Sequence, residues 1–469
     1  MHKIVAIMLT VCVGLLGGYA LTTGRMKTLF LLGGTLSLPL LLNMSARMQL
    51  TLFMAAVVLV PIQGIQAIPY SFSISELILL LLVALIFNDL LFIKKKSTYP
   101  TKSIIEYAPF LLFCFFGLFS ALRNGEINVW HTVALVPLMI FFISDKLICT
   151  AADARRLINA AFMGGIVAVF IYYIALRTGH VTYTYGGESS LTWRLGGHII
   201  ALGPVSYYYG SVTFGTMIAL AMPLLAVKSI ISRIMTKSFF ASIGTLALFM
   251  LFLIMSSARG AIIATIMSIT VILIMYAPKR FFPSVIFLIV LSISIYLIAS
   301  YGSSNIYGVH EGYFRLVDTR WAGSAMEGNL RSRLDILIST IEGMKENPMG
   351  NGYAYLWNAY GIDESIAYSM LLNGTGVAGF LSFVLIIGSM IRKFLSSFLF
   401  ESNTDQTYFS MIGFATIICG LVTGISSESF VIAPIQSMVF WTIIIASYRG
   451  VRCASTDLQA GQDTKYGHN

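Results

Sequence analysis

Long apolar runs recur along the whole chain, and they constrain its fold more than any other feature. A helix that crosses a bilayer needs about 20 mostly apolar residues, because its backbone polar groups must be satisfied within the segment. We expect such helices over residues 4–22, 28–43, 49–67, 75–93, 107–122, 131–147, 157–176, 208–227, 239–256, 261–276, 284–300, 366–390, 408–424 and 430–448. The prediction is an all-α polytopic membrane protein, a single integral membrane domain over residues 1–469 with about 14 transmembrane helices.

Composition excludes an ordinary soluble globule. Hydrophobic residues make up 57% of the chain, charged residues make up 11%, and the mean hydropathy is +0.84. Soluble domains carry about 25% charged residues. The five cysteines fall in apolar runs or at the face expected to be cytoplasmic, so we predict neither a disulfide framework nor a cysteine metal site.

The placement of the cations predicts the orientation. With both termini in the cytoplasm, most Lys and Arg residues fall in inner loops, as the positive-inside rule requires, although Arg25 and Lys27 are exceptions. The net charge of +10 therefore reflects topology and predicts no nucleic-acid partner. Residues 177–207 and 301–365 become the two large outer loops, and residues 449–469 become a cytoplasmic tail.

The loop at 301–365 is the main candidate for function, because a long polar segment between membrane helices usually binds or reacts with something. Within it, residues 329–347 predict a helix on the membrane surface, which ends at Asn347-Pro348. Its apolar stripe consists of Leu330, Leu334, Leu337, Ile341 and Met344. Arg333 lies at the edge of this stripe and is interpreted as functional, whereas Arg331 and Asp335 are spaced to pair with each other.

Several other residues can be interpreted in two ways, as structural or as functional. Arg259, at the outer mouth of two apolar runs, is either a snorkelling arginine or part of an anion site. Asp363 and Glu364 precede an apolar run, where carboxylates either cap a helix or handle protons. The remaining candidates are aromatic and belong either to the interfacial belt or to a sugar-stacking surface: Tyr353, Tyr355, Trp357 and Tyr360.

Four short motifs in order resemble the O-antigen polymerase and O-antigen ligase superfamily of bacterial envelopes. They are Ser-Ala-Arg-Gly at 257–260, Arg-Leu-Asp-Ile at 333–336, Asn-Pro-Met-Gly-Asn-Gly at 347–352 and Asn-Gly-Thr-Gly-Val-Ala-Gly-Phe at 373–380. In that superfamily a small-residue-Arg-Gly motif precedes the large periplasmic loop, an arginine opens the loop helix, and a Pro-x-Gly-x-Gly turn and a Gly-x-x-Gly follow. The resemblance covers roughly residues 200 to 390.

One departure from the family pattern favours a polymerase. Ligases of the superfamily generally place a histidine about eleven residues before the Gly-x-x-Gly, and counting back from Gly376 reaches Ser365. No histidine lies between His310 and the C-terminal tail. The resemblance therefore implies a glycosyltransferase with a GT-C-like fold in the bacterial inner membrane. It would transfer a growing glycan from undecaprenyl pyrophosphate onto a lipid-linked repeat unit at the periplasmic face.

The resemblance also implies roles for the candidate residues. Arg259, Arg333 and Arg194 would bind the pyrophosphate, because arginine makes bidentate contacts with phosphates. Glu364 or Asp363 would accept the proton of the acceptor hydroxyl, and Tyr353, Tyr355 and Trp357 would contact the glycan. No Asp-x-Asp pair for Mg²⁺ stands in an outer loop, so we expect no metal and no cofactor. Expected partners are lipid-linked oligosaccharides, the bilayer and a candidate chain-length regulator; the alternatives are an O-antigen ligase and a lipid-linked oligosaccharide flippase.

Overall fold

The computed structural model describes most of the chain after residue 43. The described residues are 44–60, 74–92, 106–177, 192–195, 198–201, 210–231, 236–255, 259–276, 324–353, 355, 366–400, 403–426 and 434–466, with isolated positions at 286, 289 and 293. The predicted runs at 4–22 and 28–43, and almost all of 284–300, lie outside this part of the chain. The count of 14 transmembrane helices therefore stays a prediction.

The described residues form a helical membrane fold, and each predicted apolar run among them contains a helix. These helices are α3 (Ala46–Val58), α4 (Ile74–Phe92), α5 (Ala108–Asn124), α6 (Ile127–Trp130), the π-helical η2 (His131–Leu135), α7 (Val136–Leu147), α8 (Ala151–Arg177), α9 (Gly210–Ile231), α10 (Lys237–Met255), α11 (Arg259–Tyr276), α14 (Ser324–Glu346), α16 (Ala367–Phe400), α17 (Thr404–Ser426) and α19 (Pro434–Tyr466). By length and composition alone, Ala367–Phe400 and Thr404–Ile425 are long and apolar enough to cross a membrane, and several other described apolar helices are shorter.

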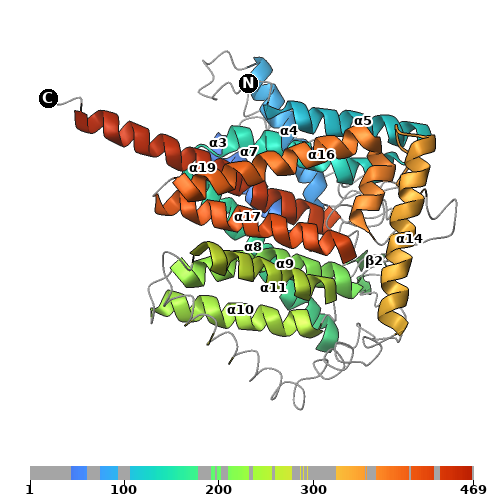
Figure 1. Ribbon diagram of the computed structural model, residues 1–469. Helices are drawn as coiled ribbons and strands as arrows, with labels where there is room; N and C mark the ends of the chain where they lie inside the picture. The colour runs from blue at the N-terminus through green and yellow to red at the C-terminus, as the bar shows by residue number, and fades with distance from the viewer. Residues whose placement is uncertain are drawn as a thin grey trace.

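Helix α17 lies at the centre of the bundle and packs against α9, α11, α16 and α19 (Figure 1). Close approach depends on glycines that face phenylalanine rings. A Cβ atom on Gly413 would lie 2.3 Å from the ring of Phe394 in α16, and one on Gly420 would lie 2.4 Å from the ring of Phe440 in α19. Small residues let membrane helices approach closely where apolar burial alone provides no driving force.

Two buried polar clusters join helices that are far apart in sequence. Arg449 of α19 donates hydrogen bonds to the side chain of Asp145 and, at 2.6 Å, to its backbone carbonyl. Near the start of α4, the Glu76 carboxylate lies 3.3 Å from His131 Nε2 of the π-helical segment, and both residues are buried. Charges in a bilayer are costly unless they are paired, so these contacts specify which helices are neighbours.

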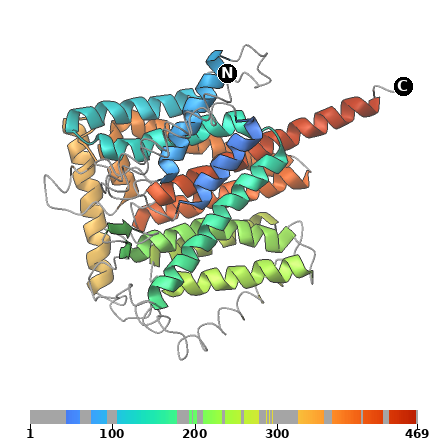
Figure 2. The ribbon, with the colours of Figure 1, turned by 180° about the vertical axis from the view of Figure 1, so that it is seen from behind.

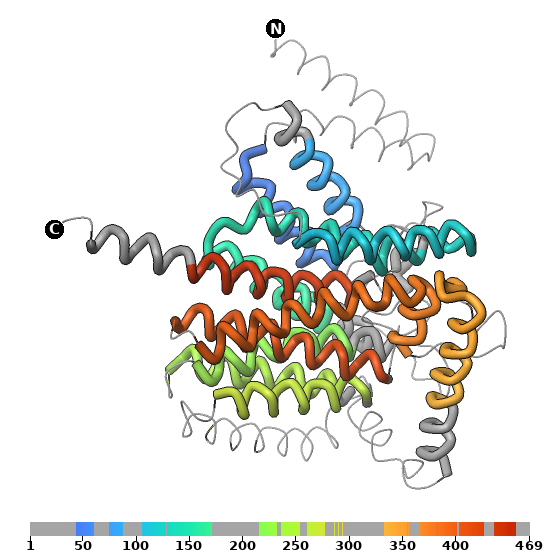
Figure 3. Tube along the Cα trace, turned by 45° about the horizontal axis from the view of Figure 1, so that its top comes forward, coloured from blue at the N-terminus to red at the C-terminus, as the bar shows by residue number. Residues whose placement is uncertain are grey.

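One end of the bundle is covered by α14, which crosses the ends of the other helices (Figures 1 and 2). The antiparallel hairpin of β1 (Thr192–Leu195) and β2 (His198–Ala201) lies at that same end, with Arg194 opposite Ile199. The sequence predicted only a loop over 177–207, so these strands add to the predicted all-α fold. Helix α19 runs away from α14 toward the other end of the bundle (Figure 3), and the predicted polar tail at 449–469 is helical as far as Tyr466.

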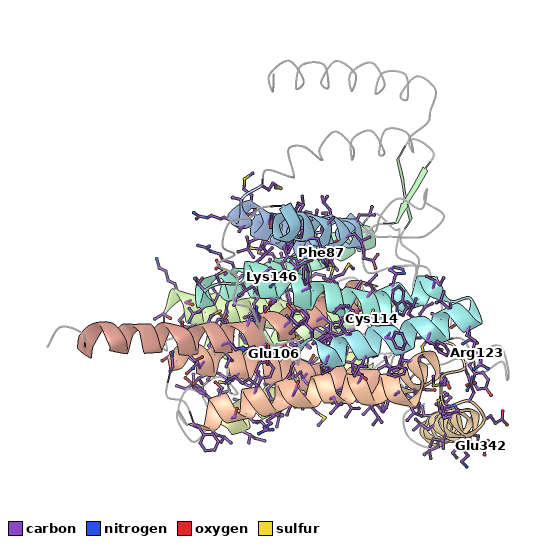
Figure 4. The ribbon with its side chains drawn as sticks, turned by 90° about the horizontal axis from the view of Figure 1, so that it is seen from above. Phe87, Glu106, Cys114, Arg123, Lys146 and Glu342 are labelled. Atoms are coloured by element: carbon purple, nitrogen blue, oxygen red, sulfur yellow. The ribbon has the colours of Figure 1, made fainter. Side chains whose placement is uncertain are left out.

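Cysteine labelling should place the two ends of the bundle on opposite sides of the membrane. Exposed Glu342 of α14 lies at one end of the bundle (Figure 4). Exposed Cys149, expected in an inner loop, follows Lys146, which lies toward the other end (Figure 4). In intact spheroplasts, an impermeant thiol reagent should label Glu342→Cys in a cysteine-free background. It should label a variant that retains only Cys149 after permeabilisation alone. Labelling of Cys149 in intact cells would reverse the predicted orientation.

Candidate functional site

Two of the sequence motifs meet in space and form what we call the motif junction, residues 347–353 together with residues 373–377. The turn at 347–353 lies against a break in α16, where Gly376 has the non-helical angles φ 69° and ψ 179°. The N–H groups of Asn351 and Gly352 donate to the Asn373 carbonyl at 2.8 and 3.1 Å, and the Val377 N–H donates to the Pro348 carbonyl at 3.0 Å. The break in the helix therefore frees backbone groups that the turn then satisfies.

Glycine is required at the junction for two reasons. Gly350, Gly352 and Gly376 all have positive φ, at 106°, 100° and 69°, a conformation that strains residues with a side chain. Space is also absent, because a Cβ atom on Gly376 would lie 2.6 Å from the carbonyl carbon of Met349. These glycines are therefore found where the backbone of the turn at 347–353 lies in close contact with the backbone of α16.

The Tyr353 side chain lies between the motif junction and α5 and is fully buried. A Cβ atom on Gly374 would lie 2.0 Å from its ring, and one on Gly117 of α5 would lie 3.3 Å from its hydroxyl oxygen. Burial raises the pKa of this hydroxyl, which has no hydrogen-bond partner among the described residues. The two glycines leave a slot that the Tyr353 ring fills. The contact of this ring with a glycan stays a prediction.

Arg123 of α5 and Glu126, which precedes α6, hold the two ends of the turn, a feature that the sequence did not predict. The Arg123 guanidinium donates to Asn347 Oδ1 at 2.8 Å. The Glu126 carboxylate accepts a hydrogen bond from the backbone N–H of Tyr353. Both contacts join residues more than 200 positions apart in the chain, so no local pattern could reveal them.

Helix α14 docks on the first part of α16, and its buried side includes Met344 of the predicted apolar stripe but not Leu334 or Ile341. Ile336 and Thr340 are buried, and the Thr340 hydroxyl hydrogen-bonds to the Ser369 hydroxyl of α16. Leu334 and Ile341 of the predicted stripe are instead 57% and 53% exposed. The helix therefore has two apolar faces, one on the protein and one outside it, and the outer one fits the predicted membrane-surface helix.

Arg333 lies on the protein-facing side of α14 and is half-buried. Its Nη1 donates to the backbone carbonyl of Ile425 in the last turn of α17. The last carbonyls of a helix lack helical partners and carry partial negative charge, so an arginine stabilises this helix end. Burial lowers the pKa of Arg333, yet guanidinium groups stay charged in proteins. The pyrophosphate role of Arg333 remains a prediction.

The other predicted site residues are described only in part. Arg259 is the first residue of α11, which packs along α17, and Arg194 lies in β1. Tyr355 is half-buried and covers Gly343 of α14, where a Cβ atom would lie 2.8 Å from its ring. Asp363, Glu364 and Trp357 lie outside the described residues. Within the described part of the chain, no three His, Cys, Asp or Glu side chains gather as a metal site would require.

Fold and site together define a helical integral membrane protein with a folded loop helix docked across one end of its bundle. Residues 244–382 match the family model described as O-antigen ligase. This match confirms, over that part of the chain, the resemblance to the O-antigen polymerase and ligase superfamily, and it contains all four motifs. No curated protein matches the chain at the significance required.

Replacing Gly376 with alanine should break the motif junction. The Cβ atom would meet the Met349 backbone and the positive φ would be strained, a cost of about 1–3 kcal/mol for the backbone alone. We expect a lower thermal unfolding temperature in detergent, measured by intrinsic fluorescence. Gly388→Ala is the matched control, since the same helix has no atom within 4 Å of a Cβ there. Equal unfolding temperatures for the two variants would contradict this account of the junction.

Proposed function

We propose that this chain is a polymerase of O-antigen or of a related surface polysaccharide in the bacterial inner membrane, with its active site at the periplasmic face. The family match supports an enzyme that acts on lipid-linked oligosaccharides. It fits a ligase equally well. The observation that favours the polymerase is the absence of any histidine between His310 and the C-terminal tail, where ligases of the superfamily place one.

The proposed reaction exchanges one bond for another. The bond between the growing glycan and undecaprenyl pyrophosphate breaks, and a bond forms from the same sugar carbon to a hydroxyl of the lipid-linked repeat unit. The electron pair of the broken bond leaves with the diphosphate, and the hydroxyl proton passes to a carboxylate. No metal is needed in this scheme if arginines stabilise the charge that develops on the diphosphate.

Arg333 and Arg259 are the proposed diphosphate clamp, with Arg194 as a third contact. The position of Arg333 supports this proposal, because it is half-buried at the end of α17, beside which α11 packs. A partly desolvated guanidinium attracts a diphosphate more strongly than one in bulk water. Glu364 or Asp363 is the proposed base, and Tyr355 and Trp357 are the proposed glycan contacts. A protein that regulates chain length is the proposed partner.

Substitutions should distinguish the proposed clamp residues, Arg333 and Arg259, from Arg331, which is predicted to pair with Asp335. Arg333→Lys and Arg259→Lys keep the charge but lose the planar fork, so polymer formation should fall on the order of 100-fold. Arg331→Ala should stay within about twofold, because an exposed helical pair is worth about 0.3–0.5 kcal/mol. The assay resolves polymers on gels, using purified protein and lipid-linked repeat units. An essential Arg331 beside a tolerant Arg333 would reverse the assignment.

Glu364→Gln should separate the three candidate functions. The amide keeps the size and the capping ability of the side chain but cannot take up the proton, so turnover should fall while the protein level in the membrane is maintained. Cells with this variant should carry surface lipid with one repeat unit, since a separate ligase still transfers single units. Loss of all surface glycan, with wild-type protein levels, would instead favour a ligase or a flippase. Asp363→Asn is the companion variant, and long chains from both would reduce these carboxylates to helix caps.

A further inference from the structure

The corner between α5 and α6, residues 120–126, has a backbone that is fixed by its own hydrogen bonds. Helix α5 ends at Asn124 and is capped by Gly125, whose φ of 76° is left-handed. The N–H of Glu126 then donates to the Ala121 carbonyl at 2.9 Å. Asn124 Nδ2 also donates to the Ser120 carbonyl at 2.9 Å. These bonds fix the backbone that carries Arg123 and Glu126. In Figure 4, Arg123 lies at the end of α5 beside α14, where Glu342 is labelled.

The corner contacts the turn of the motif junction at its start, middle and end. Arg123 bonds to Asn347, and Glu126 bonds to the N–H of Tyr353. Between them, a Cβ atom on Gly350 would lie 2.6 Å from Ser120 Oγ, and one on Gly352 would lie 2.9 Å from Glu126 Oε2. The shape of the turn therefore matches a surface that comes from outside the family match at 244–382.

We propose that Arg123 and Glu126 are positioning residues for glycan transfer, and this inference rests on the proposed function. Asn347 directly follows the last residue of α14, so the grip on Asn347 fixes the end of the helix that carries Arg333. A hydrogen bond to a charged acceptor is about twice as strong as a neutral one, which suits Glu126 to hold a glycine-rich turn. Neither side chain needs to touch the substrate, because both act through the turn.

Three variants of Glu126 test the mechanism by which it acts. Glu126→Gln keeps an oxygen that accepts from the Tyr353 N–H, so kcat should stay within about threefold and the pH profile should not change. Glu126→Ala removes the acceptor, and kcat should fall at least about tenfold with little change in KM, because the arginine clamp acts mainly in the transition state. Equal loss in both variants would make Glu126 a base and would overturn the positioning role.

Arg123 and Asn347 provide an independent test, because they share one hydrogen bond. Arg123→Ala and Asn347→Ala should each lower kcat, and the double variant should be no worse than the more impaired single variant. Additive losses would mean that the bond does not carry the effect. The matched control is Arg156→Ala, an exposed arginine of α8 that pairs with Asp153. Its kcat should equal that of the wild type.

Tryptic cleavage separates a failure of this inference from a failure of the proposed function. Exposed Lys345 lies in the last turn of α14, next to the gripped Asn347. If Glu126→Ala releases the turn, cleavage after Lys345 should be at least several-fold faster than in the wild type and in Glu126→Gln. Unchanged cleavage would overturn the inference. A wild-type protein that forms no polymer, but shows this protection pattern, would overturn the proposed function alone.

Discussion

The contact between two stretches of backbone, at Pro348–Met349 and at Gly376, is the constraint on which the rest of the candidate site depends. It interrupts α16 within its buried part and opens that helix to the turn at 347–353. The turn ends α14, whose buried face then lies on the first part of α16. Because no side chain fits between the two backbones, the turn meets α16 through main-chain atoms, and side-chain contacts of Thr340 and Asn347 add to the position of α14.

At the same end of the bundle as the motif junction, an arginine side chain lies at the C-terminal end of a helix. Arg333 contacts the last turn of α17, the helix around which the bundle packs. At the far end, Arg449 and Asp145 form a buried pair that joins α19 to α7. Arginine contacts thus lie at both ends of the bundle. The two contacts differ in burial. Arg449 and Asp145 are buried, whereas Arg333 on the loop helix α14 is half-buried.

The sequence predicted the elements of this fold better than their contacts. Apolar length identified the helices, and Asn347-Pro348 correctly marked the end of the loop helix, because both signals are local. The burial of Tyr353 and the grip of Arg123 and Glu126 depend on segments more than 200 residues apart, which periodicity cannot reveal. The apolar stripe of α14 was visible, but its sequence could not tell a protein-facing side from a lipid-facing one, since both are apolar.

The corner at 120–126 has a consequence for how this protein can be recombined with its relatives. The family match runs from residue 244 to residue 382 and is one continuous block in the sequence. In three dimensions, that block is completed by a surface from the other half of the chain. A chimera that exchanges only the matched block would set a foreign turn against Ser120, Arg123 and Glu126. The folded unit around the motif junction is therefore discontinuous in sequence, and we expect that its two parts must be exchanged together.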